Sequence, residues 1–246
     1  MKLASGFITL FSALSMLSCS SFGPNAEYYY PVDDLADGMV YAYESVGPIQ
    51  LPPHYWFYRS VETPDSLVLT STRYTSDFEP RQFVNERIVK SGSLMRDLRL
   101  FTPTVGASET VVADVLAPAM FSFEIPDTGR ILVNAVSFSY ADLKIRQNAE
   151  ENESALYTLT RNRRFIKDTS FTLSGKPVPS QLWSVRELTE QDSIGVLALE
   201  SQAIEIYAQG VGLVYRERMH SDGSQEAFRL KGRFSMDSLL SMRDGR

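Results

Sequence analysis

Apolar and polar residues alternate with a period of two through most of this chain, a pattern typical of β-strands with one buried face. Pro, Gly, Asn and Asp interrupt the alternation at short intervals, as they do between the strands of antiparallel sheets. The sequence therefore predicts a mostly β, antiparallel protein. The expected strands are residues 39–44, 55–61, 66–74, 83–89, 94–101, 110–116, 121–125, 131–140, 156–160, 171–173, 182–188, 194–199, 203–207, 211–219 and 225–234.

Helical patterns are confined to two windows. Residues 143–155 are rich in glutamate and fit either a helix or a polar loop, and Ser235 is placed to cap a short helix that runs through Met242. Because no repeat or linker divides the chain, we expect one β domain over residues 28–234, followed by a short helix or tail over residues 235–246. A curved sheet of the half-barrel kind and a sandwich both fit, each with few short helices.

The N-terminus has the features of a lipoprotein signal peptide. Lys2 precedes an apolar run over residues 7–17 that is too short to span a bilayer, and the small Ser18 stands before Cys19, the single cysteine of the chain. The sequence predicts a cleaved signal peptide over residues 1–18, acylation of Cys19 and a lipidated tether over residues 19–27. An ordinary secretory leader is the alternative interpretation.

Acylation of Cys19 predicts a protein anchored to the bacterial cell envelope, with the membrane as its first partner. Ser20 rather than an aspartate follows the cysteine, which favours the outer membrane, with the domain facing the periplasm. The formal net charge of −6 gives no general attraction to nucleic acid, so we expect no nucleic-acid partner.

The clearest local element is a C-terminal hairpin of residues 211–219 and 225–234. Asp222 and Gly223 suit a two-residue type I′ turn, and this turn pairs Arg216 with Arg229. The register would place five basic side chains together on the outer face: Arg216, Arg218, Arg229, Lys231 and Arg233.

This basic patch is the sharpest polar feature of the sequence. Like charges that face one another destabilise a hairpin unless something anionic neutralises them. The functional interpretation is a site for a phosphate, a sugar acid or a lipid headgroup. The alternative interpretation is neutralisation by a neighbouring strand, for which Glu200 and Glu205 are available.

Metal and catalytic signatures are weak. Asp33 to Glu44 resembles a calcium loop, but Leu35 occupies a ligand position, and the two histidines, His54 and His220, are far apart. We therefore assign no metal, no cofactor and no catalytic residue. His220 lies beside Ser221 and Asp222 in the hairpin loop, where turn chemistry explains these residues.

Two short segments resemble uncharacterised lipoproteins of the Bacteroidota. Residues 207–217 read Tyr-Ala-Gln-Gly-Val-Gly-Leu-Val-Tyr-Arg-Glu, and residues 29–32 with 38–43 resemble the first strand of the same proteins. Those proteins look similar to the periplasmic half-barrel carriers of the LolA/LolB type. The resemblance implies a curved antiparallel sheet that surrounds an apolar cavity, although this chain has fewer helices than such carriers.

Three functions fit these observations. The leading hypothesis is an envelope lipoprotein that holds an apolar or amphipathic ligand, and it predicts a cavity of about 300 Å³ or more. The second is a structural or assembly lipoprotein that docks another envelope protein, and it predicts a filled interior. The third is a hydrolase of envelope glycan or lipid, and it predicts converging polar groups with shifted pKa values.

Overall fold

The computed structural model describes residues 22–104, 107–125, 127–140, 155–192 and 197–245. The described residues form twelve strands, two short 3₁₀ helices and one α-helix. Their bounds are η1 Pro24–Tyr28, η2 Val32–Asp34, β1 Met39–Ser45, β2 His54–Thr63, β3 Ser66–Tyr74, β4 Pro80–Val89, β5 Gly92–Thr104, β6 Ala107–Ser122, β7 Ile131–Tyr140, β8 Ala155–Leu173, β9 Lys176–Asp192, β10 Leu197–Ala208, β11 Gly212–His220, β12 Gln225–Phe234 and α1 Met236–Asp244.

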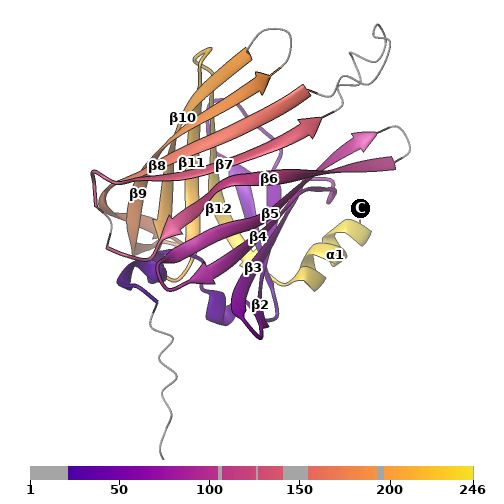
Figure 1. Ribbon diagram of the computed structural model, residues 1–246. Coiled ribbons are helices and arrows are strands. Elements are labelled where there is room, and N and C mark those ends of the chain that lie inside the picture. The colour runs from indigo at the N-terminus through magenta and orange to yellow at the C-terminus, as the bar shows by residue number, and fades with distance from the viewer. Residues whose placement is uncertain (1–21, 105–106, 126, 141–154, 193–196, 246) are drawn as a thin grey trace, which may run out of the picture.

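The strands form a closed antiparallel barrel (Figure 1). Each strand pairs with the next, and β1 also pairs with β12, from Val40 opposite Phe234 to Ser45 opposite Phe228. The mostly β, antiparallel prediction is confirmed, but the half-barrel and the sandwich are wrong. The physical reason is that closure satisfies the hydrogen bonds of both outermost strands, which an open sheet would leave unpaired.

Most strand predictions are confirmed, and β3, β7 and β12 have the expected bounds. The predicted strand 110–116 and the first two residues of the predicted strand 121–125 join into β6, which ends at Ser122. They join because Pro118 lies just after a register shift that accommodates it opposite Asn134. Residues 156–160 and 171–173 likewise belong to the single strand β8. The helical window 143–155 lies outside the described residues up to position 154, and Ala155 begins β8.

The N-terminal segment closes one end of the barrel. Its η1 helix lies against the turns of that end, where the Asn25 side chain donates a hydrogen bond of 2.8 Å to the Ser122 carbonyl, and the Gly210 amide donates one of 2.7 Å to the Glu27 carbonyl. Residues 22–27 therefore pack on the barrel, although the sequence predicts a tether there. Tyr29 and Tyr30 follow and are buried inside.

An aromatic cluster packs inside the closed end of the barrel, next to this N-terminal segment. Its largest buried members include Tyr29, Tyr41, Phe121, Trp183 and Tyr207. The α1 helix covers the outside of the barrel (Figure 1), and its Leu239 packs with Val40, Ala42 and Tyr55. The middle of β1 is therefore buried on both faces.

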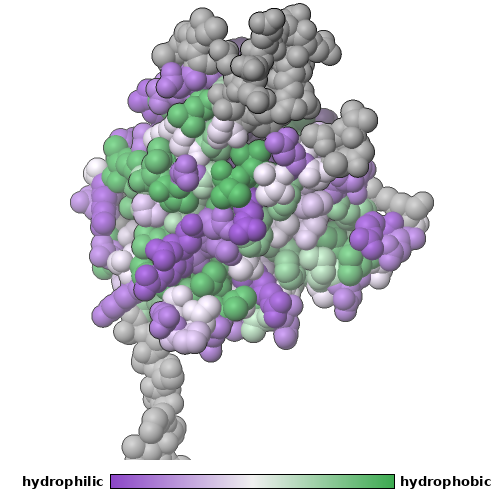
Figure 2. All heavy atoms as spheres, turned by 45° about the vertical axis from the view of Figure 1, so that its right-hand side comes forward, coloured by the Kyte–Doolittle hydropathy of each residue, from purple (hydrophilic) through white to green (hydrophobic). Residues whose placement is uncertain are grey.

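Other parts of the outer surface are mixed. On the face shown in Figure 2, hydrophilic and hydrophobic side chains lie in small interspersed groups. None of the helices in the described parts of the chain has the length and apolar character needed to cross a membrane.

Gly212 allows the N-terminal segment to fit. Its φ angle is +98°, and a Cβ atom at this position would lie 2.6 Å from the ring of Tyr30, which stacks on Tyr58 with ring centroids 4.0 Å apart. We expect Gly212→Ala to lower the free energy of unfolding by about 1–3 kcal/mol in urea denaturation, because it adds a clash to backbone strain. Gly210→Ala is the control, since Gly210 has φ +68° but open space around it. Equal losses in the two variants would show that the contact with Tyr30 contributes nothing.

Candidate functional site

The barrel encloses a cavity of about 640 Å³. Tyr29 and Tyr30 of the N-terminal segment line it at the closed end. Strand β1 runs from that end to Ser45, so the loop of residues 46–53 lies at the opposite end, where Leu51 and the nearby Asp77 also line the cavity. The cavity therefore reaches from a closed aromatic floor to the loops of the other end.

One wall of the cavity is apolar. It comes from β4, β5, β7 and β8, whose inward side chains include Val84, Met95, Leu98, Val136 and Leu159. These residues belong to a second hydrophobic cluster, separate from the aromatic cluster of the floor. This wall presents an apolar surface to whatever occupies the cavity.

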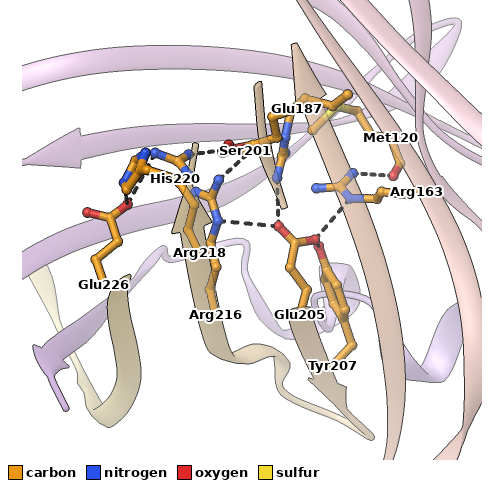
Figure 3. Close-up of polar contacts among 11 residues, drawn as sticks. Met120, Arg163, Glu187, Ser201, Glu205, Tyr207, Arg216, Arg218, His220 and Glu226 are labelled. Carbon is orange, nitrogen blue, oxygen red and sulfur yellow. Dashed lines mark hydrogen bonds and ion pairs between the residues drawn. The ribbon is translucent and has the colours of Figure 1, made fainter. Parts of the chain in front are cut away.

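The adjoining wall is charged and comes from β8 to β11 (Figure 3). Glu205 of β10 is 1% exposed and accepts hydrogen bonds from Arg161 Nη2 at 2.6 Å and Arg163 Nε at 3.0 Å. The Tyr207 hydroxyl donates to the same carboxylate at 3.1 Å. Glu205 is thus a central acceptor of the wall, and Arg163 is anchored further by the Met120 carbonyl.

Glu187 of β9 is the second acceptor. Its carboxylate forms ion pairs with Arg161 Nε at 2.5 Å, Arg216 Nη2 at 2.7 Å and Arg218 Nη2 at 2.7 Å. Arg218 also reaches Glu226 of β12 at 3.1 Å. The strand register explains this clustering, because Arg161 lies opposite Glu187, and Glu205 lies opposite Arg216.

The arginines control the charge of both glutamates. Burial acts to raise the pKa of Glu205, but Arg163, Arg161 and Arg216 outweigh it and hold that pKa well below its usual range. The same balance lowers the pKa of Glu187 to about 2. For Arg216 the charged form is disfavoured, because burial lowers its pKa to about 10 and Glu187 offsets this effect only in part. Both glutamates are therefore anions at neutral pH.

The predicted basic patch is divided between the two faces of the barrel. Arg216 and Arg218 point inward and line the cavity. Arg229 and Lys231 lie outside and pair with Glu44 at 3.0 and 3.3 Å, whereas Arg233 lies over the ring of Tyr41. The five residues therefore do not form one surface.

The predicted hairpin register is wrong by one residue. Arg216 lies opposite Phe228, and Tyr215 lies opposite Arg229. The loop is longer than a type I′ turn, since the His220 amide donates to the Ser224 carbonyl at 2.9 Å. A shift of one residue moves a whole strand's side chains to the other face, and this shift separates the five bases. Glu205 pairs with Arg216 at 3.6 Å, in agreement with the alternative interpretation of neutralisation by a neighbouring strand.

Several residues of the cavity were not predicted from the sequence. Arg161, Arg163 and Glu187 are charged residues at inward positions of long strands, and their spacing of two was the available signal. At the closed end, buried Glu86 accepts hydrogen bonds from the Tyr29 and Ser93 hydroxyls. Burial raises the pKa of Glu86, and those hydrogen bonds offset the effect only in part.

His54 lies on the same side of the cavity as Arg73 of β3. Its ring stacks on Tyr43 at 5.3 Å between centroids and meets Phe228 edge-on at 4.5 Å. Its Nδ1 atom is buried and has no hydrogen-bond partner among the residues that the structure describes. Burial, and then the charges of Arg73 and Arg216, lower the pKa of His54 to about 3. His54 is therefore neutral at pH 7.

This shift predicts a loss of stability in mild acid. An unfolded histidine binds a proton below a pH of about 6.5, whereas folded His54 does so only near pH 3, so stability falls as the pH decreases between these values. We expect about 1–2 kcal/mol to be lost between pH 7 and pH 5 in urea denaturation, and most of this loss to disappear in His54→Phe. His220→Gln removes the other histidine and is the control. A wild-type loss that persists in His54→Phe would contradict the assignment.

The predicted lipidation site and the question of a metal site remain to be placed against the structure. Cys19, the predicted lipidation site, lies outside the described residues. Within the described ranges, no group of three or more His, Cys, Asp or Glu side chains is arranged to hold a metal ion.

Two solved structures share this fold. One is a presumed lipoprotein of Parabacteroides distasonis, with a TM-score of 0.51 and 14% sequence identity over 82% of this chain and 95% of that chain. The other is a presumed exported protein of Bacteroides fragilis described as having a YmcC-like fold, with a TM-score of 0.52 and 11% identity over 88% of this chain and 100% of that one. No protein-family model matches the chain, and no curated protein matches it.

At these identities the likeness shows the fold alone. The expected similarity to lipoproteins of the Bacteroidota is confirmed at that level. The finer expectation of a LolA/LolB-type carrier receives no support from these structures.

Proposed function

We propose that this protein is an exported envelope lipoprotein that binds an amphipathic small molecule inside its barrel. The observation that carries the proposal is the cavity of about 640 Å³ with one apolar wall and one charged wall. This volume lies within the range of about 300–1,000 Å³ that is typical of small-molecule sites.

The two walls support an amphipathic ligand rather than a purely apolar one. Side chains such as Leu98 and Val136 gain free energy when an alkyl chain displaces water from them. The charged side chains of the other wall are already held in place by their mutual ion pairs, so a polar group meets a preorganised surface. The assembly hypothesis predicts a filled interior, and the cavity favours binding over it.

Lipidation at Cys19 would also orient the barrel. Phe22 is the first described residue, and a chain of about three residues spans at most about 11 Å. Acyl groups at Cys19 would therefore hold the closed end of the barrel next to the membrane. The loops at the other end would face away from that membrane, into the periplasm if the anchor lies in the outer membrane.

Metabolic labelling tests the anchor. Radiolabelled palmitate is expected to enter the full-length protein, and Cys19→Ala is expected to abolish the label and release the protein from membranes. A variant that remains membrane-bound, or a wild-type protein without label, would contradict lipidation at Cys19.

Isothermal titration calorimetry tests binding. The mature chain with Cys19→Ser, purified without detergent, is titrated with decyl phosphate and with decanol below their micellar or solubility limits. We expect saturable one-to-one binding of at least one of these amphiphiles. Failure of both to bind would contradict the proposed function.

A further inference from the structure

We propose that the polar group of the ligand is an anion, a phosphate or a carboxylate, held in a subsite formed by Arg73, Arg216 and Arg218. This proposal rests on the proposed function and specifies the chemistry of its ligand. The three arginines all line the cavity, but they come from strands that are far apart in the sequence. Arg73 belongs to β3, and the other two belong to β11.

Barrel closure brings these strands to one side of the cavity. The order β3, β2, β1, β12, β11 is continuous around the barrel, and the closure between β1 and β12 is the link that completes it. The inward side chains between the two arginine-bearing strands are aromatic or neutral, including Tyr43, His54 and Phe228, and Glu226 is the carboxylate on this arc. The arginines therefore flank a largely uncharged surface.

The arginines of the cavity outnumber the carboxylates that pair with them. Five arginines of the described ranges line the cavity: Arg73, Arg161, Arg163, Arg216 and Arg218. The ion pairs of the described residues supply them with three carboxylates, those of Glu187, Glu205 and Glu226. Two further acids line the cavity, Asp77 near the loops and Glu86 at the floor with Tyr29 and Ser93.

Among the described arginines that line the cavity, Arg73 has the weakest pairing. It forms no ion pair within the described part of the chain. Burial is the largest cause that lowers the pKa of Arg73, and the charge of Arg218 lowers it further. The charge of Glu226 acts in the opposite direction. The guanidinium groups of Arg73 and Arg218 thus repel one another, and an anion between them would remove that repulsion.

Arg216 and Arg218 also keep unused hydrogen-bond donors. The Nε atoms of both side chains are buried and have no acceptor in the described structure. The Nε of Arg216 lies 3.6 Å from Glu205, beyond hydrogen-bond distance. A buried N–H without an acceptor costs free energy, and a guanidinium group binds phosphate or carboxylate through paired donors. The two Nε atoms gain an acceptor if their guanidinium groups turn toward a ligand oxygen.

Two double variants test the subsite, and each variant removes two positive charges. Arg73→Gln with Arg218→Gln changes the cavity, whereas Arg229→Gln with Lys231→Gln changes the outer face of the barrel. Decyl phosphate, decanol and inorganic phosphate are titrated into each mature Cys19→Ser protein by calorimetry. Thermal unfolding checks the fold, and the single variant Arg73→Gln replaces the cavity double variant if that protein is unfolded.

We expect decyl phosphate to bind at least about tenfold more tightly than decanol, and the cavity double variant to lose at least about tenfold of that affinity. Arg73→Gln alone is expected to lose at least about threefold, and the outer double variant to stay within about twofold of the parent protein. Inorganic phosphate that binds as tightly as decyl phosphate would support the anion subsite but identify a free anion as the ligand.

Three results would overturn the subsite. They are equal affinity for decanol and decyl phosphate, unchanged phosphate affinity in the cavity variants, and equal losses in the cavity and outer variants. In the first two cases the binding of amphiphiles still stands. If no amphiphile binds to the parent protein, the proposed function itself fails.

Discussion

Replacing Glu205 with glutamine is expected to lower the free energy of unfolding by about 3–5 kcal/mol. Glu205 is almost fully buried and pairs with the buried Arg163 and with the partly buried Arg161 in the wall of the cavity. The amide keeps the size of the side chain but removes its charge. Arg163 then loses its carboxylate partner, and a buried cation without a partner is among the costliest defects that a protein interior can contain.

Glu200 provides a matched control on the same strand. It forms a two-point ion pair with Arg186, at 2.8 Å for both contacts, but both side chains are exposed. Glu200→Gln is therefore expected to cost less than about 1 kcal/mol. Urea denaturation at pH 7 measures both variants. Similar losses at Glu200 and Glu205 would show that the inner network is no stronger than a surface pair.

Filling the cavity is expected to abolish binding. Leu159 of β8 lies opposite Val136 and lines the apolar wall, and a tryptophan at this position would extend into the space that an alkyl chain would occupy. We expect Leu159→Trp to weaken the binding of decyl phosphate by at least about 100-fold, or about 2.7 kcal/mol, in calorimetry. The fold is expected to persist because the cavity offers room for the larger ring.

Val112→Trp is the control for this prediction. Val112 is 61% exposed on β6, so the same type of residue is placed on the outer surface. We expect its affinity for decyl phosphate to match that of the parent protein. A Leu159→Trp protein that is folded and still binds with full affinity would place the ligand outside the cavity.

The strands could be predicted because their signal is local. A period of two is visible in residues 66–74, 131–140 and 225–234, whose bounds match β3, β7 and β12. Closure of the barrel depends on the pairing of β1 with β12. That contact joins distant parts of the chain and leaves no pattern in either strand, so an open sheet and a closed barrel predict the same sequence alternation.

The candidate site was harder to predict for two physical reasons. Alternation separates the two faces of a strand but does not say which face lies inside the barrel. Arg161, Arg163 and Arg216 point inward because this barrel encloses a cavity rather than a dry core. The hairpin loop adds a register error, since its residues 220–224 form a longer loop than the Asp222-Gly223 pair indicates.

Barrel closure is what connects the fold to the proposed function. It places Arg73 on the same side of the cavity as Arg216 and Arg218, opposite an apolar wall that includes Leu98. An open half-barrel would expose the same side chains to bulk water, where the Coulomb attraction between each arginine and an anionic ligand is much weaker. The structure thus supports binding of an amphiphile in a partly dry, preorganised space.

Native mass spectrometry of the lipoprotein purified from the membranes of its own bacterium tests the central claim most directly. We expect the folded protein to carry one small-molecule adduct beyond its covalent acyl groups, and this adduct to be released on unfolding and to be absent from Leu159→Trp. A folded wild-type protein whose mass shows the chain and its acyl groups alone would contradict the claim that the barrel holds a ligand.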